Sequence, residues 1–206
     1  MKNRFLLLSL VLLFSKFSIQ SQNFENQLKS GELKVAYFAS GCFWCVEAIY
    51  ESMEGVEEAI SGYSGGHTKN PTYKSTGTGK TGHAETVAVY YNPKLVTYVS
   101  LIQAYFGSQD PTTFGQSPDF GSAYRSLIFY QNDYEKEVAQ KYFNSLNKSV
   151  YKGEMLTEIV PFKKFYKAEE YHQNFEKLHP NNRYVQGVSI PRLKLFKKRF
   201  PELLKQ

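Results

Sequence analysis

Apolar and polar residues follow two periods along the chain, and these periods predict alternating strands and helices. Five short runs rich in apolar and aromatic residues predict strands, at residues 33–39, 56–63, 84–91, 124–130 and 156–160. Longer segments predict helices, at residues 42–53, 97–106, 132–149 and 168–178. This order predicts a single α+β domain over residues 22–206, a split βαβ arrangement with helices on one face of a mixed sheet and long polar loops between elements.

The first residues have the pattern of an export signal. Lys2 and Arg4 precede the apolar run 5–14, and Lys16 follows it. This run is well short of the roughly 20 residues that cross a bilayer. Residues 1–21 are therefore predicted to be a secretory signal peptide cut near residues 20–22, and the mature protein to be periplasmic or secreted without a stable membrane anchor. An uncleaved short anchor is the alternative.

The charge of the mature chain is small. The whole chain has 25 Lys and Arg against 19 Asp and Glu, and removal of residues 1–21 leaves 22 against 19, a net charge of +3. We expect no nucleic-acid partner from so small an excess. A monomer is the default expectation. Much of the positive charge lies near the C-terminus, where a solvated tail is expected to pack its apolar residues on the domain.

Two cysteines, Cys42 and Cys45, lie three positions apart. A disulfide that closes so short a loop constrains the unfolded chain very little, so the pair indicates redox chemistry or half of a metal site. Cys42 opens the helix predicted at 42–53, where unpaired N–H groups and the helix dipole favour an anion. We therefore predict a lowered thiol pKa at Cys42, the nucleophile, with Cys45 as its resolving partner.

The residues between the cysteines are Phe43 and Trp44, two bulky aromatics. An open dithiol exchanger would have a small spacer that leaves the sulfur atoms accessible to a partner protein. The aromatic pair instead predicts a wall beside the thiol, against which a small apolar group could bind. Ordinary core positions at the start of a helix are the alternative for each residue.

Several motifs resemble those of one enzyme family. They occur in the family's order across residues 33–175 and are Gly41-Cys42-Phe43-Trp44 with Glu47, Gly62-Tyr63, Gly65-Gly66-His67, Asn70-Pro71-Thr72-Tyr73, Thr81-Gly82-His83-Ala84-Glu85, Asp110-Pro111-Thr112-Thr113, Asp119, Tyr124-Arg125-Ser126 and Ala168-Glu169-Glu170-Tyr171-His172-Gln173. Together they resemble the A-type peptide methionine sulfoxide reductases. The resemblance implies a ferredoxin-like two-layer sandwich and a thiol enzyme that reduces the S epimer of methionine sulfoxide, free or in proteins, with no bound cofactor.

The resemblance also implies a role for each residue of the site. Cys42 would attack the sulfoxide sulfur, and Glu85, kept protonated by a dry aromatic pocket, would give its proton to the oxygen. Tyr73 and Tyr124 match the family tyrosines that hydrogen-bond this oxygen, and Asp119 matches a carboxylate that organises polar groups and water. Phe43 and Trp44 match the pair that encloses the S-methyl group.

Methionine would then leave a sulfenic acid on Cys42. Many relatives resolve it with a cysteine in a C-terminal tail, but residues 184–206 contain none. We therefore expect Cys45 to form a disulfide with Cys42, which an external dithiol such as a thioredoxin-like protein would reduce. In the alternative, the donor attacks Cys42 directly and Cys45 is only a buried helix residue.

Some positions depart from the family pattern. Gln109 and Ala123 replace the usual His and Gln, and residues 74–78 replace a segment that is commonly acidic. These changes affect the rim of the pocket rather than the reacting groups.

Two other functions are alternatives. One is a general disulfide exchanger. The other is a metal-binding module that combines the cysteines with two of the four histidines, His67, His83, His172 and His179, but the spacing of these histidines matches no common zinc pattern.

Overall fold

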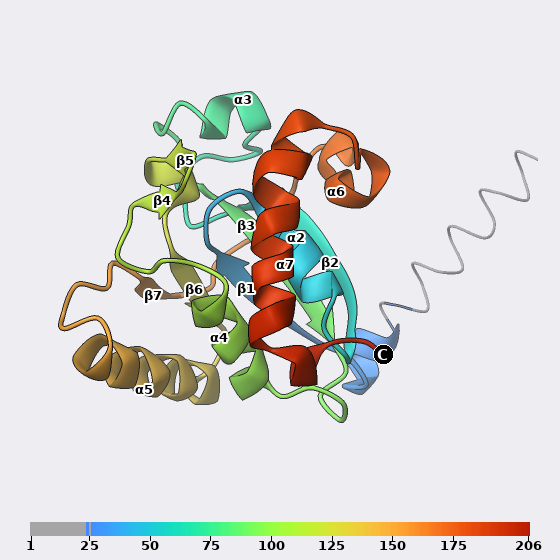
Figure 1. Cartoon of the computed structure of the whole chain (residues 1–206), viewed down its shortest axis with the longest axis vertical. Coiled ribbons are helices and arrows are strands. Elements are labelled where there is room, and N and C mark those ends of the chain that lie inside the picture. Colours follow the sequence, from blue (N-terminus) through green and yellow to red (C-terminus); the bar gives the residue numbers. More distant parts are fainter. Residues whose placement is uncertain (1–23, 25) are drawn as a thin grey trace, which may run out of the picture. The chain divides into compact units, whose positions relative to one another are not determined.

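The computed structural model describes residue 24 and residues 26–206, of which residues 35–206 form one compact unit (Figure 1). The predicted signal peptide at residues 1–21 lies outside the described residues. Residues 26–30, which precede the compact unit, are helical. Within the described part of the chain, each helix is too short or too polar to cross a bilayer.

Six strands form the main sheet, in the order β7-β6-β1-β3-β2-β8. Their bounds are β1 (Lys34–Ala39), β2 (Val56–Ser64), β3 (Ala84–Tyr91), β6 (Leu127–Tyr130), β7 (Glu158–Pro161) and β8 (Tyr166–Lys167). β1 pairs with β6, and β2 with β3 and β8, in antiparallel register, whereas β6 and β7 are parallel. The predicted α+β fold with a mixed sheet is confirmed.

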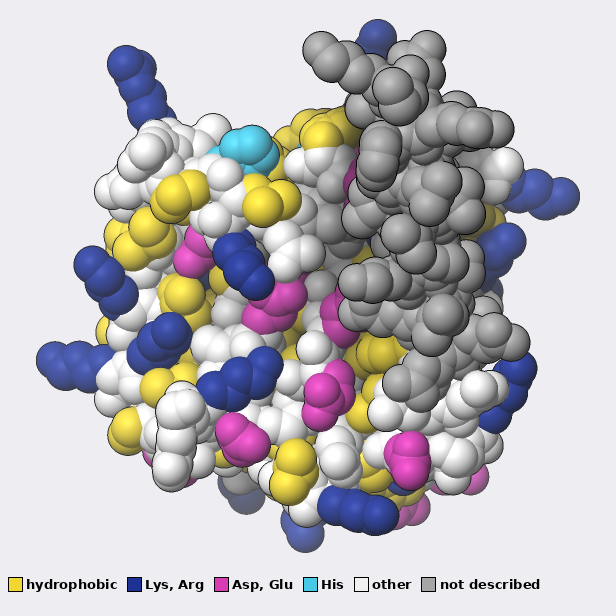
Figure 2. Space-filling view, turned by 90° about the vertical axis from the view of Figure 1, so that its right-hand side faces the viewer, with side chains coloured by type: hydrophobic (Ala, Val, Ile, Leu, Met, Phe, Trp, Pro, Cys, Tyr) yellow, Lys and Arg dark blue, Asp and Glu magenta, His cyan; other side chains and the backbone are white. Residues whose placement is uncertain are grey.

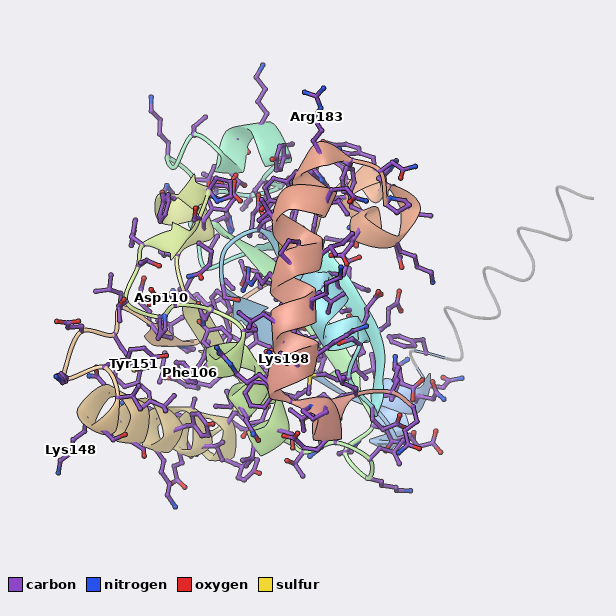
Figure 3. All side chains as sticks on the ribbon, viewed as in Figure 1. Phe106, Asp110, Lys148, Tyr151, Arg183 and Lys198 are labelled. Carbon is purple, nitrogen blue, oxygen red and sulfur yellow. The ribbon has the colours of Figure 1, made fainter. Side chains whose placement is uncertain are left out.

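Helices cover one face of this sheet, and their bounds are α2 (Phe43–Glu51), α4 (Tyr98–Gly107), α5 (Asp133–Ser149) and α7 (Ile190–Arg199). α2 packs on β2 and β3, while α7 lies across α2 and α4 (Figure 1). The core between these layers includes the fully buried side chains of Phe38, Ile49 and Leu101. In Figure 3, Phe106 lies between α4 and α5, and Lys148 points away from the fold. Burial of such side chains is the main source of stability for this layer.

The second face of the sheet is covered by a loop instead of helices. Side chains alternate along β1, so Phe38 faces the helices and Tyr37 the opposite side. Phe162, in the segment after β7, stacks on Tyr37 with ring centroids 3.9 Å apart, and Phe165 lies beside it at 5.6 Å. Two aromatic rings from one loop thus protect the second face.

The long polar segment between β2 and β6 contains short elements. They are α3 (Tyr73–Thr76), the hairpin of β4 (Gly115–Gln116) and β5 (Asp119–Phe120), and the 3₁₀ turn η1 (Ser122–Tyr124). Basic and acidic side chains are interspersed on the described part of the face in Figure 2. Such a mixed surface is typical of soluble domains.

Two predictions for the C-terminal third are corrected. Residues 168–178 are not one helix, because Asn174 has a left-handed φ of 53° that separates the 3₁₀ turn η2 (Glu170–His172) from α6 (Phe175–Leu178). The expected tail is in fact a π-helical segment, η3 (Val185–Ser189), that continues into α7. Phe196 of α7 is 1% exposed, so this region is part of the core.

Candidate active site

The turn between β1 and α2 places Cys42 at the start of the helix. Gly41 has a left-handed φ of 82°, and a Cβ atom there would lie 2.8 Å from the side chain of Gln116. Only glycine satisfies both constraints. The Gly41 N–H donates to the Tyr124 carbonyl oxygen at 3.0 Å. Cys42 is consequently the N-cap residue of α2, nearly buried at 7% exposure and tied to the segment that contains Tyr124.

Glu85 on β3 meets Cys42 at this helix start. The Phe43 N–H donates to Glu85 Oε2 at 2.9 Å, and Glu85 is only 3% exposed. Burial raises the pKa of Glu85 to about 8, although the hydrogen bond from Phe43 opposes this shift and nearby Asp119 adds to it. The carboxyl group is therefore largely protonated at neutral pH and can donate a proton. A raised pKa of Glu85 is what the sequence analysis predicts.

Two tyrosines bring their hydroxyl groups to the same place. Tyr73 opens α3, where Glu169 Oε1 accepts from its N–H at 3.0 Å, and Tyr124 ends η1. Cys42 and Asp119 are electrostatic neighbours of both hydroxyl groups. Burial raises the pKa of both tyrosines, and Glu85 adds to the increase as a neighbour. Both hydroxyls therefore stay protonated and are available as hydrogen-bond donors.

Asp119 on β5 completes the polar group together with a residue that the sequence did not predict. Its Oδ2 accepts from the Tyr184 hydroxyl at 2.5 Å, and the same hydroxyl oxygen lies 3.9 Å from Cys45 Sγ. Tyr184 lies just before η3, in the segment expected to be a tail. No local sequence pattern indicates this contact, because residue 184 is brought close to α2 only by the tertiary fold.

Phe43 and Trp44 have different environments. Phe43 is 1% exposed, with its ring 6.2 Å from Tyr73 and 5.9 Å from Tyr63. One face of the partly exposed Trp44 stacks on Phe175 at 3.7 Å, and its Nε1–H donates to His172 Nδ1 at 3.2 Å. Phe43 thus contributes to the core and to the pocket wall, whereas Trp44 is held in place by residues of the C-terminal third.

The two thiols interact with each other. Burial raises the pKa of the Cys42 thiol, and a hydrogen bond from Cys42 lowers the pKa of Cys45 to about 6. The prediction of a lowered pKa at Cys42 was therefore wrong for the reduced pair. Burial outweighs the helix dipole, and the first N–H of α2 donates to Glu85 rather than to the sulfur. Because the thiols share a proton, they titrate as a unit.

The structure therefore brings Cys42, Cys45, Glu85, Tyr73, Tyr124 and Asp119 together, as predicted. Among residues 24 and 26–206, no three His, Cys, Asp or Glu side chains are grouped so that they could hold a metal ion. The assembled groups are a nucleophilic thiol pair, a neutral carboxylic acid and hydroxyl donors. This combination can attack and protonate a polar S=O group.

Comparison with known proteins agrees with this chemistry. Residues 34–204 match the family model described as peptide methionine sulfoxide reductase. The chain is 42% identical to peptide methionine sulfoxide reductase MsrA 1 of Rhodopirellula baltica, over 90% of this chain and 96% of that protein. It is 43% identical to MsrA 2 of Mesorhizobium japonicum, over 82% and 89%.

Solved structures give the same result. Methionine sulfoxide reductase A of Corynebacterium diphtheriae matches with a TM-score of 0.66 and 32% identity, over 73% of this chain and 77% of that one. Mxr1 of Saccharomyces cerevisiae in its reduced form matches with a TM-score of 0.66 and 33% identity, over 74% and 88%. With its site, its fold and its relatives in agreement, the chain belongs to the peptide methionine sulfoxide reductases of the A type, the oxidoreductases that reduce the S epimer of methionine sulfoxide.

Proposed function

We propose that Cys42 attacks the sulfoxide sulfur while Glu85 gives its proton to the sulfoxide oxygen. The observation that carries this assignment is the buried, largely protonated Glu85 at the same helix start as Cys42. The thiol pair supplies the nucleophile, because a proton moving along the hydrogen bond from Cys42 to Cys45 leaves the negative charge on Cys42. Methionine leaves, and Cys42 retains the oxygen as a sulfenic acid.

The other residues of the site bind and orient the substrate in this proposal. Tyr73 and Tyr124 donate hydrogen bonds to the sulfoxide oxygen, and Asp119 fixes the polar groups around it. Phe43 and Trp44 enclose the S-methyl group. Support comes from the position of both tyrosines beside Glu85 and from the aromatic contacts of Phe43. The apolar ring faces favour a polarisable sulfur substituent.

An assay with separated sulfoxide epimers and dithiothreitol tests the assignment of Cys42. We expect the wild type to reduce the S epimer alone, and Cys42→Ser to have no turnover because the nucleophile is lost. Cys45→Ser is the matched control: with dithiothreitol, which can attack Cys42 directly, it should still turn over. Turnover by Cys42→Ser would refute the assignment.

We infer that Cys45 closes the second half of the reaction by forming a disulfide with Cys42, which a thioredoxin-like dithiol protein then reduces. The hydrogen bond between the thiols supports this route, because it puts the second sulfur within reach of the first. With a dithiol protein as donor, Cys45→Ser should still release one methionine per chain, more slowly because the proton acceptor for Cys42 is lost, and should lose most of its steady-state rate. An unchanged steady-state rate would instead favour direct attack of the donor on Cys42.

The proposed place of action is outside the cytoplasm, because residues 1–21 have the pattern of an export signal. Expression of the full chain in a bacterium with two membranes, followed by fractionation and N-terminal sequencing, tests this. We expect a periplasmic or secreted protein that begins near residues 20–22. A protein that stays in the cytoplasm with its first residues intact would contradict the proposal.

A further inference from the structure

The C-terminal segment that replaces the expected tail also surrounds Cys45. Cys45 is 2% exposed, on the helix face against which α7 and η3 pack. Tyr184 approaches its sulfur to 3.9 Å. The second neighbour is Arg192, in the first turn of α7, which lies against Gly41, one helical turn before Cys45, and whose positive charge lowers the pKa of this thiol.

The guanidinium group of Arg192 is held rigidly beside the cysteine turn. Its Nε donates to the Ser108 carbonyl oxygen at 2.8 Å and its Nη2 to the Ser40 carbonyl oxygen at 3.0 Å. Its Nη1 lies against Gly41, 3.5 Å from where a Cβ atom would be. Because the carbonyl oxygens that accept these hydrogen bonds are uncharged, the guanidinium group keeps its full positive charge. A planar donor fixed at two points keeps its positive charge at a constant position.

Cys45 needs such a cation at one step of the cycle. A buried thiol resists ionisation, and only the thiolate attacks a sulfenic acid efficiently. In the reduced enzyme, a hydrogen bond from Cys42 contributes most to ionising Cys45. Once Cys42 carries the oxygen, that thiol donor no longer exists. The first step does not change Arg192, so its charge remains when Cys45 has to react.

We propose that Arg192 is a positioning residue for the resolving step, where it stabilises the Cys45 thiolate that attacks the Cys42 sulfenic acid. The inference rests on the disulfide route proposed above. In this step the Cys45 sulfur forms the S–S bond as the Cys42 S–O bond breaks. The Cys45 sulfur is oxidised and the Cys42 sulfur reduced. The departing hydroxide combines with the proton that Cys45 gave up, and water leaves.

Other titratable groups also face Cys45, and they determine how the step should depend on pH. These groups are Cys42 on its own helix, Glu85 on β3, Tyr184 with its partner Asp119, and Arg192 on α7, together with the Ser189 hydroxyl. Glu85 titrates in every variant of Arg192, whereas burial raises the pKa of Tyr184 so that its hydroxyl stays protonated. A difference between the pH profiles of wild type and variant therefore isolates the contribution of the guanidinium group.

Rapid-quench experiments separate the two halves of the reaction. Reduced enzyme is mixed with (S)-methionine sulfoxide without reductant, and methionine and the Cys42–Cys45 disulfide are each quantified over time. The variants are Arg192→Met, which removes the charge, and Arg192→Lys, which keeps it. Arg199→Met is the matched control, because Arg199 lies on the same helix and its Nη1 donates to the Gly107 carbonyl oxygen.

In Arg192→Met, at a pH at least one unit below the wild-type midpoint, disulfide formation should be slower by about tenfold, because a rise of about one unit in the Cys45 pKa lowers the thiolate fraction by that factor. Methionine formation should be slowed less than disulfide formation, because in the reduced enzyme the hydrogen bond from Cys42 contributes most to ionising Cys45. The pH profile of disulfide formation should move upward by about one unit and meet the wild-type curve at high pH. Arg192→Lys should recover most of the rate, and Arg199→Met should match the wild type.

Two outcomes would overturn the inference, and they differ from each other. If Arg192→Met slows methionine and disulfide formation equally, or leaves the pH profile in place, Arg192 only braces the turn at residues 40–41. If the wild type itself forms no Cys42–Cys45 disulfide, the proposed route fails, and with it the role of Arg192. Thermal unfolding of each variant identifies a loss of rate that comes from misfolding.

Discussion

At the scale of single residues, one buried carboxyl group carries the chemistry. Glu85 is 3% exposed and accepts the first N–H of α2, so its environment combines desolvation with a single hydrogen bond. Desolvation has the larger effect, and the pKa is raised to about 8. The same group would be an ordinary ionised carboxylate at the exposed edge of a strand. Burial is thus what would allow Glu85 to act as the proposed general acid.

This predicts the direction of the pH dependence of methionine formation. Glu85 must be protonated to act, and its protonated fraction falls as pH rises through about 8. The first-turnover rate should therefore decline above about pH 8 in the wild type. Glu85→Gln should lose this decline and be slower by roughly 10²-fold or more, because an amide cannot donate the proton.

The control for Glu85 is Glu158→Gln, a change to an exposed carboxylate that pairs with Arg125 at the far side of the sheet. Rapid-quench rates of methionine formation across the pH range give the readout. The control should keep both the rate and the decline at high pH. A Glu85→Gln profile that still falls with the wild-type midpoint would identify another group as the acid.

Residues of the site differ in how far the sequence could predict them. Cys42 could be predicted from its place in a cysteine pair at a helix start, whereas Glu85, Tyr73, Tyr124 and Asp119 could be predicted because they match residues of the family that the sequence resembles. Tyr184 and Arg192 could not, because no local pattern links them to the cysteines. Their roles depend on α7 returning to α2, which is a tertiary contact. The thiol pKa was also missed, since burial cannot be read from helix position alone.

At the scale of elements, α2 is held to the sheet through a buried carboxyl group. Glu47 is 2% exposed and accepts hydrogen bonds from the Ser61 hydroxyl of β2 and from the Asn174 N–H. Burial raises its pKa from 4.5 to about 7. One side chain thus joins the helix that begins at Cys42, the central sheet and the break between η2 and α6.

Glu47 should make the stability of the fold depend on pH. The folded-state pKa is above the unfolded one, so the folded state binds the proton more tightly, and this stabilisation is lost as pH rises from about 4.5 through about 7. Glu47→Gln keeps the shape of the protonated group. The difference in unfolding free energy between the variant and the wild type should therefore be larger at about pH 8 than at about pH 4.5, in favour of the variant, by roughly 2–4 kcal/mol.

Urea unfolding of both proteins at the two pH values measures this gain, and Glu57→Gln, at an exposed position of β2, serves as the control. The control should differ from the wild type by the same amount at both pH values. If Glu47→Gln also shows a constant difference, the carboxyl group is not held protonated by its burial.

The same elements explain why the sequence predicted the first two-thirds of the fold better than the last. β3 (Ala84–Tyr91) and α5 (Asp133–Ser149) have clear apolar periods that match the observed bounds closely. The helix predicted at 168–178 fails because the side chain of Gln173 hydrogen-bonds β2 at Ser61 and Asn174 turns left-handed. Long-range contacts override local propensity there.

At the scale of the whole molecule, the sheet determines where the chemistry lies. β1 ends where the turn to Cys42 begins, and β3 beside it carries Glu85, so neighbouring strands provide the nucleophile and the acid. The η1 and β5 segments close the site on one side, and η3 and α7 close it on the other. The mixed sheet with helices on one face could be predicted from the order of elements, but the closure by the C-terminal segment could not.

The most direct test of the account is the mass of the protein after one turnover. Fully reduced enzyme receives (S)-methionine sulfoxide without any reductant and is then treated with an alkylating agent. We predict one methionine released per chain, a protein mass lower by two hydrogens, and a peptide pair joined through Cys42 and Cys45. A mass higher by one oxygen, with Cys45 alkylated beside an oxidised Cys42, would contradict it.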